Sequence, residues 1–137
     1  MCGIVAVTGY KKALPLLING LEKLEYRGYD SAGIAIINPE TNSITCNKAE
    51  GKLKNLKNNL NDENIPGTVG IGHTRWATHG KPEFKNAHPH IDGSGTIAVV
   101  QNGIIENFQD LKNKLEKEGI IFNSDTDTEV IPHLIQR

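Results

Sequence analysis

Short apolar segments rich in β-branched residues come in runs along this chain, and segments with helical periodicity separate the runs. Strands are predicted at residues 2–8, 32–37, 43–48, 69–74, 96–101 and 120–122. Apolar residues repeat at helical spacing at residues 14–24, 53–60, 108–115 and 130–135. Because no repeat, low-complexity tract or linker separates two parts, this order predicts one α+β domain over Met1–Arg137.

Local signals mark the ends of these elements. Gly28 and Gly119 follow the first and third helical segments and are predicted to end them. Thr126 and Glu129 have the spacing of a capping box, which predicts that the last helix begins there. Residues 78–95 are rich in Gly, Pro, His and Asn and have no periodicity, so we expect a long loop of the kind that often carries function.

Composition narrows the classes of partner. The 137 residues are 37% hydrophobic and 23% charged, which suffices for a domain with its own core. Fifteen Lys and Arg residues balance sixteen Asp and Glu residues, and the basic residues are scattered, so no nucleic-acid or membrane partner is expected. No apolar run approaches the roughly 20 residues that span a bilayer. With no secretion signal at the N-terminus, the protein is expected to be cytoplasmic.

The two cysteines are expected to be free thiols with different roles. Cys46 lies in an alternating segment and is predicted to be a half-buried strand residue. Cys2 follows Met1 and precedes Gly3, and a small second residue permits removal of Met1, which would leave a free α-amine on the residue that carries the thiol. Such an amine has a pKa of about 7.7–8.0 and can act as the general base. Taken by itself, however, this pattern fits a buried terminal cysteine better than a nucleophile.

Six segments, taken together and in order, favour the nucleophile. Residues 2–5, 25–33, 72–80, 86–90, 102–107 and 126–129 match, in order, segments of class II glutamine amidotransferases, which the whole chain resembles. Tyr-Arg-Gly-Tyr-Asp-Ser at 26–31 and His-Thr-Arg-Trp-Ala-Thr-His-Gly at 73–80 resemble the glucosamine-6-phosphate synthase branch. They are less similar to amidophosphoribosyltransferase, asparagine synthetase or glutamate synthase.

The resemblance implies a fold and a reaction. The fold would be the N-terminal-nucleophile hydrolase type, a four-layer αββα sandwich with two antiparallel sheets between helical layers, here truncated to its N-terminal part. The reaction would be hydrolysis of L-glutamine to glutamate and ammonia, without cofactor or metal. In the complete family enzyme, expected to be a homo-oligomer, the ammonia passes to a sugar-isomerase domain, absent from this chain, that makes glucosamine 6-phosphate. Two alternatives stay open, namely a different ammonia acceptor and a non-catalytic remnant that serves as an interaction module.

The resemblance also implies catalytic residues. Cys2 would be the nucleophile, and the side-chain amide of Asn102 and the backbone N–H of Gly103 would donate to the oxyanion of the tetrahedral intermediate. An ordinary Asn-Gly turn is the alternative interpretation of that pair. Arg27 would lie near the nucleophile, although a cation at a predicted helix end needs no functional explanation.

A second group would bind glutamine. Arg75 would hold the α-carboxylate with its planar fork, and Asp127 would accept from the α-ammonium, although the helix dipole alone favours an acidic residue there. Trp76, Thr78 and His79 would belong to a lid over the substrate, with a core aromatic as the alternative for Trp76. The histidines lack paired Cys or acidic ligands at zinc spacing, so no metal is expected.

Overall fold

The main sheet has four antiparallel strands in the order β1-β4-β2-β3. The computed structural model describes residues 1–60, 65–77 and 81–137. The strands are Gly3–Val7 (β1), Ser31–Ile37 (β2), Ile44–Glu50 (β3) and Gly70–Arg75 (β4). Because β4 pairs with β1 on one side and β2 on the other, its last residues lie beside the first residues of β1.

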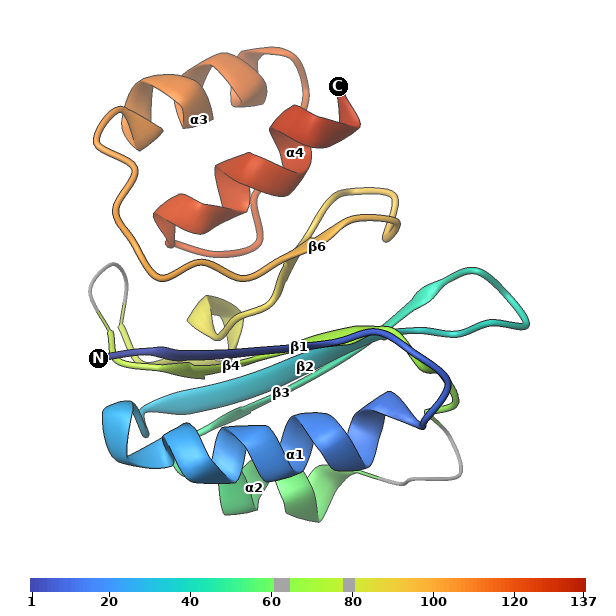
Figure 1. Ribbon diagram of the computed structural model, residues 1–137. Helices are drawn as coiled ribbons and strands as arrows, with labels where there is room; N and C mark the ends of the chain where they lie inside the picture. The colour runs from blue at the N-terminus through green and yellow to red at the C-terminus, as the bar shows by residue number, and fades with distance from the viewer. Residues whose placement is uncertain (61–64, 78–80) are drawn as a thin grey trace.

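Two helices, Ala13–Leu24 (α1) and Leu53–Asn59 (α2), cover one face of this sheet (Figure 1). Leu17 and Leu21 of α1 lie on its apolar face and are fully buried against Ile34 and Ile36 of β2 and Leu56 of α2. The main hydrophobic core therefore lies between the sheet and α1 and α2.

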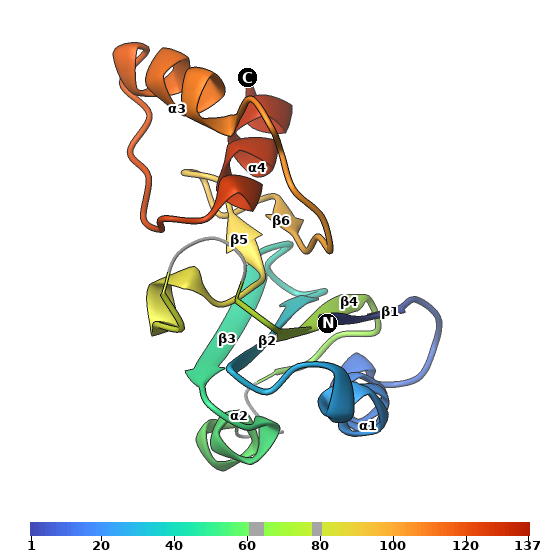
Figure 2. The same cartoon turned by 90° about the vertical axis from the view of Figure 1, so that its left-hand side faces the viewer.

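The opposite face carries a second sheet and a second helical layer (Figures 1 and 2). His90–Ile91 (β5) and Ala98–Val99 (β6) form a two-stranded antiparallel sheet, and Phe108–Lys117 (α3) and Val130–Gln136 (α4) lie outside it. The order of layers is helix, sheet, sheet, helix, as expected for an αββα arrangement. None of the described helices is long and apolar enough to traverse a bilayer.

The chain passes very close to the main sheet at Gly33. A Cβ atom at Gly33 would lie only 2.0 Å from the main-chain oxygen of His88, so a side chain there would collide with backbone. Glycine at this position thus permits the segment that leads into β5 to lie directly on β2. The contact holds the two sheets together next to the pocket described below.

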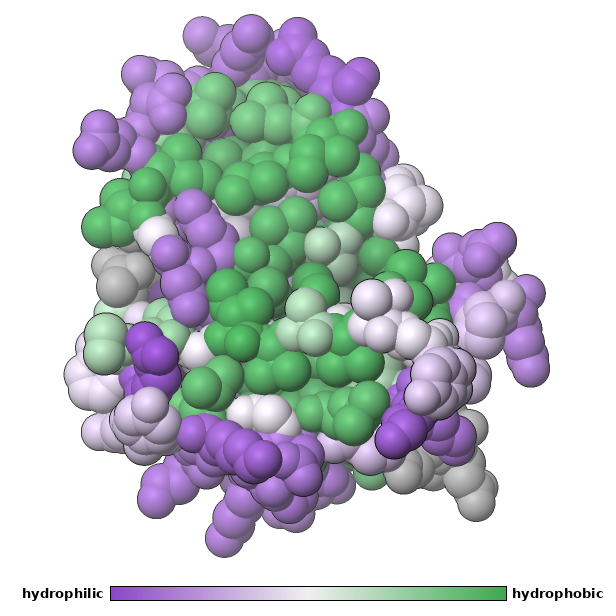
Figure 3. Space-filling view, viewed as in Figure 1, coloured by the Kyte–Doolittle hydropathy of each residue, from purple (hydrophilic) through white to green (hydrophobic). Residues whose placement is uncertain are grey.

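Apolar surface remains on the side of the molecule shown in Figure 3, where hydrophobic residues gather between the main sheet and α3 and α4. In the second sheet, the helices outside it and the segments that connect them, here called the upper layers, several large apolar residues are exposed. The exposed fractions are 63% for Ile104, 77% for Ile121 and 61% for Ile135. The upper layers therefore bury their apolar residues less completely than the core beneath α1.

Most of the predicted elements are confirmed, since β1 to β4 and the four helices occupy the predicted segments within a few residues. One predicted strand is shorter than expected and another is wrong. Residues 96–101 form a strand only at Ala98–Val99, because the Asp92 carboxylate accepts the N–H groups of Thr96 and Ile97 at 2.8 and 2.6 Å and holds them in a turn. Residues 120–122 are irregular, because the N–H of Ile120 bonds to Leu115 at the end of α3.

Two predicted helix ends also differ. Thr126 makes no capping bond, because its hydroxyl bonds instead to buried His90, at 2.7 Å, and Glu129 accepts from the N–H groups of Asn123 and Ser124. A short 3₁₀ segment, Asp127–Glu129 (η4), precedes α4. Likewise Gly28 follows a 3₁₀ segment, Glu25–Arg27 (η1), rather than α1 itself. Gly119 ends α3 as predicted, in the left-handed region at φ +91°.

Candidate active site

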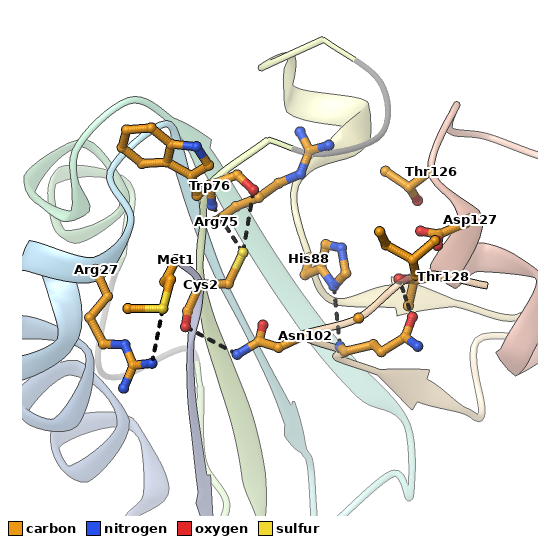
Figure 4. Close-up of a pocket in the computed structure, with 13 residues that line it drawn as sticks. Met1, Cys2, Arg27, Arg75, Trp76, His88, Asn102, Thr126, Asp127 and Thr128 are labelled. Atoms are coloured by element: carbon orange, nitrogen blue, oxygen red, sulfur yellow. Dashed lines mark hydrogen bonds between the residues drawn. The ribbon is translucent and has the colours of Figure 1, made fainter. Parts of the chain in front are cut away.

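A pocket of about 510 Å³ lies where β1 begins and β4 ends, facing η4. Its lining comprises Met1, Cys2, Arg27, Arg75, Trp76, His88, Gln101, Asn102, Gly103, Ile104, Thr126, Asp127 and Thr128 (Figure 4). Every predicted site residue that the structure describes is therefore in this lining. Thr78 and His79 lie outside the described residues.

The sulfur of Cys2 is held against the end of β4. Gly3 pairs with Thr74, so Cys2 lies next to the residues that follow that strand. The main-chain N–H of Trp76 donates to the Cys2 Sγ at 3.1 Å, and the thiol in turn reaches the Trp76 carbonyl oxygen at 3.4 Å. Figure 4 shows both contacts at the pocket wall.

The side chain of Asn102 bridges Cys2 and buried His73. Its Nδ2 donates to the main-chain oxygen of Cys2 at 3.1 Å, and its Oδ1 lies 2.8 Å from the Nε2 of His73. The strand expected to support Asn102 ends at Val99, so side-chain hydrogen bonds rather than a sheet ladder hold this segment. Gly103 follows as an exposed residue of the lining.

Three buried histidines form a cluster that reaches Asn102 through His73. The rings of His73 and His88 stack at 4.2 Å with an angle of 15°, and His88 meets His90 edge-on at 4.6 Å. Burial lowers the pKa of His73 to about 4, against hydrogen bonds to Asn102 and the Gln101 main chain that raise it, and nearby Arg75 lowers it further. Burial first, and then neighbouring positive groups, lower the pKa values of His88 and His90 as well. All three imidazoles are therefore neutral near pH 7.

These histidines do not form a metal site. Within residues 1–60, 65–77 and 81–137 no group of three His, Cys, Asp or Glu side chains is arranged to hold a metal ion. His90 instead bonds to Thr126, and His88 Nδ1 accepts from the N–H of Gln101 at 3.4 Å.

A buried cation and a buried carboxylate line opposite parts of the pocket (Figure 4). Arg75 and Asp127 are each 3% exposed. Burial lowers the pKa of Arg75, and Asp30, Cys2 and Asp127 oppose that shift. Arg75 donates to the Lys81 carbonyl oxygen at 3.2 Å, and Asp127 accepts from the N–H of Ile105 at 2.7 Å. One pocket therefore offers both signs of charge to a zwitterionic ligand.

The mouth of the pocket is aromatic and accessible. Trp76 is 48% exposed and packs edge-on against Tyr29 at 5.5 Å, so the alternative of a core aromatic is wrong. Arg27 lies in η1 and reaches the sulfur of Met1 at 3.9 Å. Met1 itself is 75% exposed and lines the pocket.

Sequence reasoning missed several lining residues, among them Gln101, His88, Thr126 and Thr128. Thr128 donates to the side-chain oxygen of Gln101 at 2.9 Å, which connects η4 to the segment that carries Asn102. Signals for them were present in the sequence, because Gln101 precedes Asn102, and His88 and the two threonines lie in the matched segments 86–90 and 126–129.

Comparisons with known proteins agree with this geometry. Residues 42–137 match the family model described as a glutamine amidotransferase domain. The chain is 59% identical over 135 residues to glutamine--fructose-6-phosphate aminotransferase [isomerizing] of Clostridium tetani, and 60% identical over 136 residues to that of Gloeobacter violaceus. Each alignment covers 98% of this chain and 22% of the relative, so the chain spans about a fifth of the length of these curated relatives.

Solved structures show the same architecture. The glutamine phosphoribosylpyrophosphate amidotransferase of B. subtilis superposes with a TM-score of 0.82 at 31% identity, covering 100% of this chain and 29% of that one. A structure described as the allosteric regulatory enzyme of purine biosynthesis gives a TM-score of 0.83 at 32% identity, covering 100% and 30%. The expected α+β fold of the N-terminal-nucleophile amidotransferases is confirmed. The chain belongs to the glutamine amidotransferase domain family.

Proposed function

We propose that this chain hydrolyses L-glutamine to glutamate and ammonia with Cys2 as the nucleophile. The observation that carries the proposal is the meeting of the Cys2 thiol and the Asn102 amide in one pocket with buried Arg75 and Asp127. Glutamine needs each of these groups, because its side-chain amide is attacked while its α-carboxylate and α-ammonium have to be recognised. Arg75 would bind the carboxylate, and Asp127 the ammonium.

The chemistry follows from removal of Met1. The free α-amine of Cys2 takes the thiol proton, and the thiolate attacks the amide carbon of glutamine. Asn102 Nδ2 and the Gly103 N–H donate to the oxygen that becomes negative. The protonated amine then gives its proton to the leaving nitrogen, ammonia departs, and water hydrolyses the thioester to glutamate. Arg27 lies beside Met1 and would face the α-amine once Met1 is gone.

We further propose that residues 1–137 are the N-terminal part of a larger amidotransferase domain. The relatives named glutamine--fructose-6-phosphate aminotransferase suggest that the ammonia serves formation of glucosamine 6-phosphate, with the acceptor site in residues outside this sequence. Trp76 at the pocket mouth, together with Thr78 and His79, would close over bound glutamine.

The test compares two forms of the chain, one with Cys2 as the first residue and one that retains Met1. Intact mass verifies each N-terminus, and release of both glutamate and ammonia is measured. We expect hydrolysis only with a free Cys2 amine, abolished by Cys2→Ala and unaffected by Cys46→Ala. Absence of hydrolysis in the processed form would favour the non-catalytic alternative.

A further inference from the structure

We infer that His73 is a positioning residue that fixes the orientation of the Asn102 amide, and so makes Asn102 a donor to the oxyanion. This inference rests on the role proposed above for Asn102. It is carried by a 2.8 Å contact between the Nε2 of His73 and the Oδ1 of Asn102, residues 29 positions apart in the sequence.

The contact determines which nitrogen of His73 carries the proton. The main-chain oxygen of Cys2 can only accept, so the NH₂ end of the Asn102 amide has to face it, at 3.1 Å. The Oδ1 end therefore faces His73, and an amide oxygen can only accept. His73 is consequently the Nε2–H tautomer and donates to Asn102.

The orientation matters because a rotated amide would reverse its chemistry. Turning the amide by half a turn exchanges donor and acceptor, so the oxygen rather than the NH₂ would approach the negative intermediate. That rotation would also place the NH₂ against the N–H of His73, leaving two donors in contact. With its proton on Nε2, His73 thus disfavours the unproductive orientation together with the main-chain oxygen of Cys2, while one hydrogen of the NH₂ bonds to Cys2 and the second remains for the substrate.

Asn102 depends on side-chain contacts because no strand supports it. Strand β6 ends at Val99, and Asn102 is exposed at the pocket floor. His73, by contrast, is fully buried in β4 and stacked on His88, whose Nδ1 accepts the N–H of Gln101. The two stacked rings therefore hold both the main chain before Asn102 and its side chain. Burial keeps His73 neutral at working pH, with its pKa at about 4, and the positive charge of nearby Arg75 acts in the same direction.

Three substitutions test the role. His73→Gln keeps an N–H near the position of Nε2, His73→Asn keeps an amide that is too short to reach, and His73→Met keeps bulk without a donor. Removing one oxyanion donor lowers kcat by about 10²–10³-fold in other enzymes. We expect His73→Met and His73→Asn to lower kcat for glutamine by about 10–100-fold with KM unchanged within about threefold, and His73→Gln to restore most of kcat.

The controls separate positioning from a structural effect. Alkylation of Cys2 by iodoacetamide develops no oxyanion, so its rate should stay unchanged in all three variants. In an Asn102→Ala background, His73→Met should lower kcat no further, because the two residues act through one contact. His133→Gln, at a buried histidine outside the pocket, should leave kcat unchanged.

Several results would overturn the inference. The first is a His73→Met chain that keeps full kcat. The second is a His73→Met chain in which Cys2 alkylation and glutamine binding are lost together with kcat. The third is a loss of kcat from His73→Met that adds to the loss from Asn102→Ala. If the variants fail to fold, nitrogen NMR of the parent decides, because detection of the Nδ1–H tautomer at His73 contradicts the argument. A parent that hydrolyses no glutamine would instead refute the proposed function, and this inference with it.

Discussion

The main-chain N–H of Trp76 points at the sulfur of Cys2 at 3.1 Å and joins the residue before β1 to the residue after β4. The carboxylate of Asp30 holds the next peptide through the N–H of Ala77, and the N–H of Asp30 bonds to the Arg75 carbonyl oxygen at 3.1 Å. The peptide that contacts the sulfur is therefore fixed on both sides. An N–H aimed at sulfur stabilises the thiolate that forms there before attack.

A glutamine-mimicking electrophile should label Cys2 and leave Cys46 unmodified. Cys46 is half-buried in β3, and burial raises the pKa of its thiol despite the opposing charge of Lys48, so little thiolate is available there. Peptide mass spectrometry after labelling of the processed chain identifies the site. Modification of Cys46 in preference to Cys2 would contradict the assignment of the nucleophile.

Arg75→Lys and Asp127→Asn should each weaken glutamine binding by about tenfold to a hundredfold, the range of a hydrogen bond to a charged group. Lysine keeps the charge but loses the planar fork, and asparagine keeps an acceptor for the Ile105 N–H but loses the charge. Each substitution is combined with Cys2→Ala, and calorimetric titration with glutamine measures binding. The same substitutions in a chain that keeps Cys2 are tested for reactivity with iodoacetamide, which serves as the control for folding. Binding as tight as in the unsubstituted chain would refute the two substrate contacts.

The free energy of unfolding should fall as the pH falls from 6.5 to about 4. His73 has a pKa of about 4 in the folded chain against an ordinary value of 6.5, so between these values the unfolded chain binds more protons than the folded one. For His73 alone the shift corresponds to roughly 3 kcal/mol. His88 and His90 act in the same direction, since their pKa values are lowered too.

Urea unfolding at pH 7 and pH 4.5 measures this loss. The carboxyl of Asp92 titrates lower, with its pKa at about 2 because of hydrogen bonds from residues 94–97, and so contributes little in this window. His73→Gln should reduce the difference between the two pH values. Equal stability at both would show that the histidines are not held neutral.

Gly33→Ala should destabilise the fold by at least about 1–3 kcal/mol, because overpacking against backbone forces the chain to move. The added methyl group would lie 2.0 Å from the His88 carbonyl oxygen, whereas at Gly93 the nearest atom is a side-chain oxygen 3.8 Å away. Gly93→Ala is thus the matched control and should be nearly neutral. Displacement of His88, which lines the pocket, should also lower glutaminase activity by more than the loss of folded protein explains. A Gly33→Ala chain as stable as the Gly93→Ala control would refute the close approach.

Local periodicity determined most of the secondary structure. The leucines of α1 at helical spacing and the β-branched residues of β1, β2 and β4 were sufficient, because each element has one apolar pattern that suits a single conformation. The six ordered segments likewise indicated the family, and they led to several residues that line the pocket, Cys2 and Asn102 among them.

Side-chain hydrogen bonds, some local and some made only by the tertiary structure, decided which polar groups meet. Residues 96–101 have the composition of a strand, but the Asp92 carboxylate binds their first N–H groups in a turn. Thr126 and Glu129 have the spacing of a capping box, but Thr126 bonds to His90, 36 positions away, and Glu129 accepts from the nearby amides of residues 123 and 124. His73 contacts Asn102 only because β4 carries it beneath the pocket floor. Hydrogen bonds between residues distant in sequence depend on the packing of whole layers, and sequence patterns carry no information about that packing.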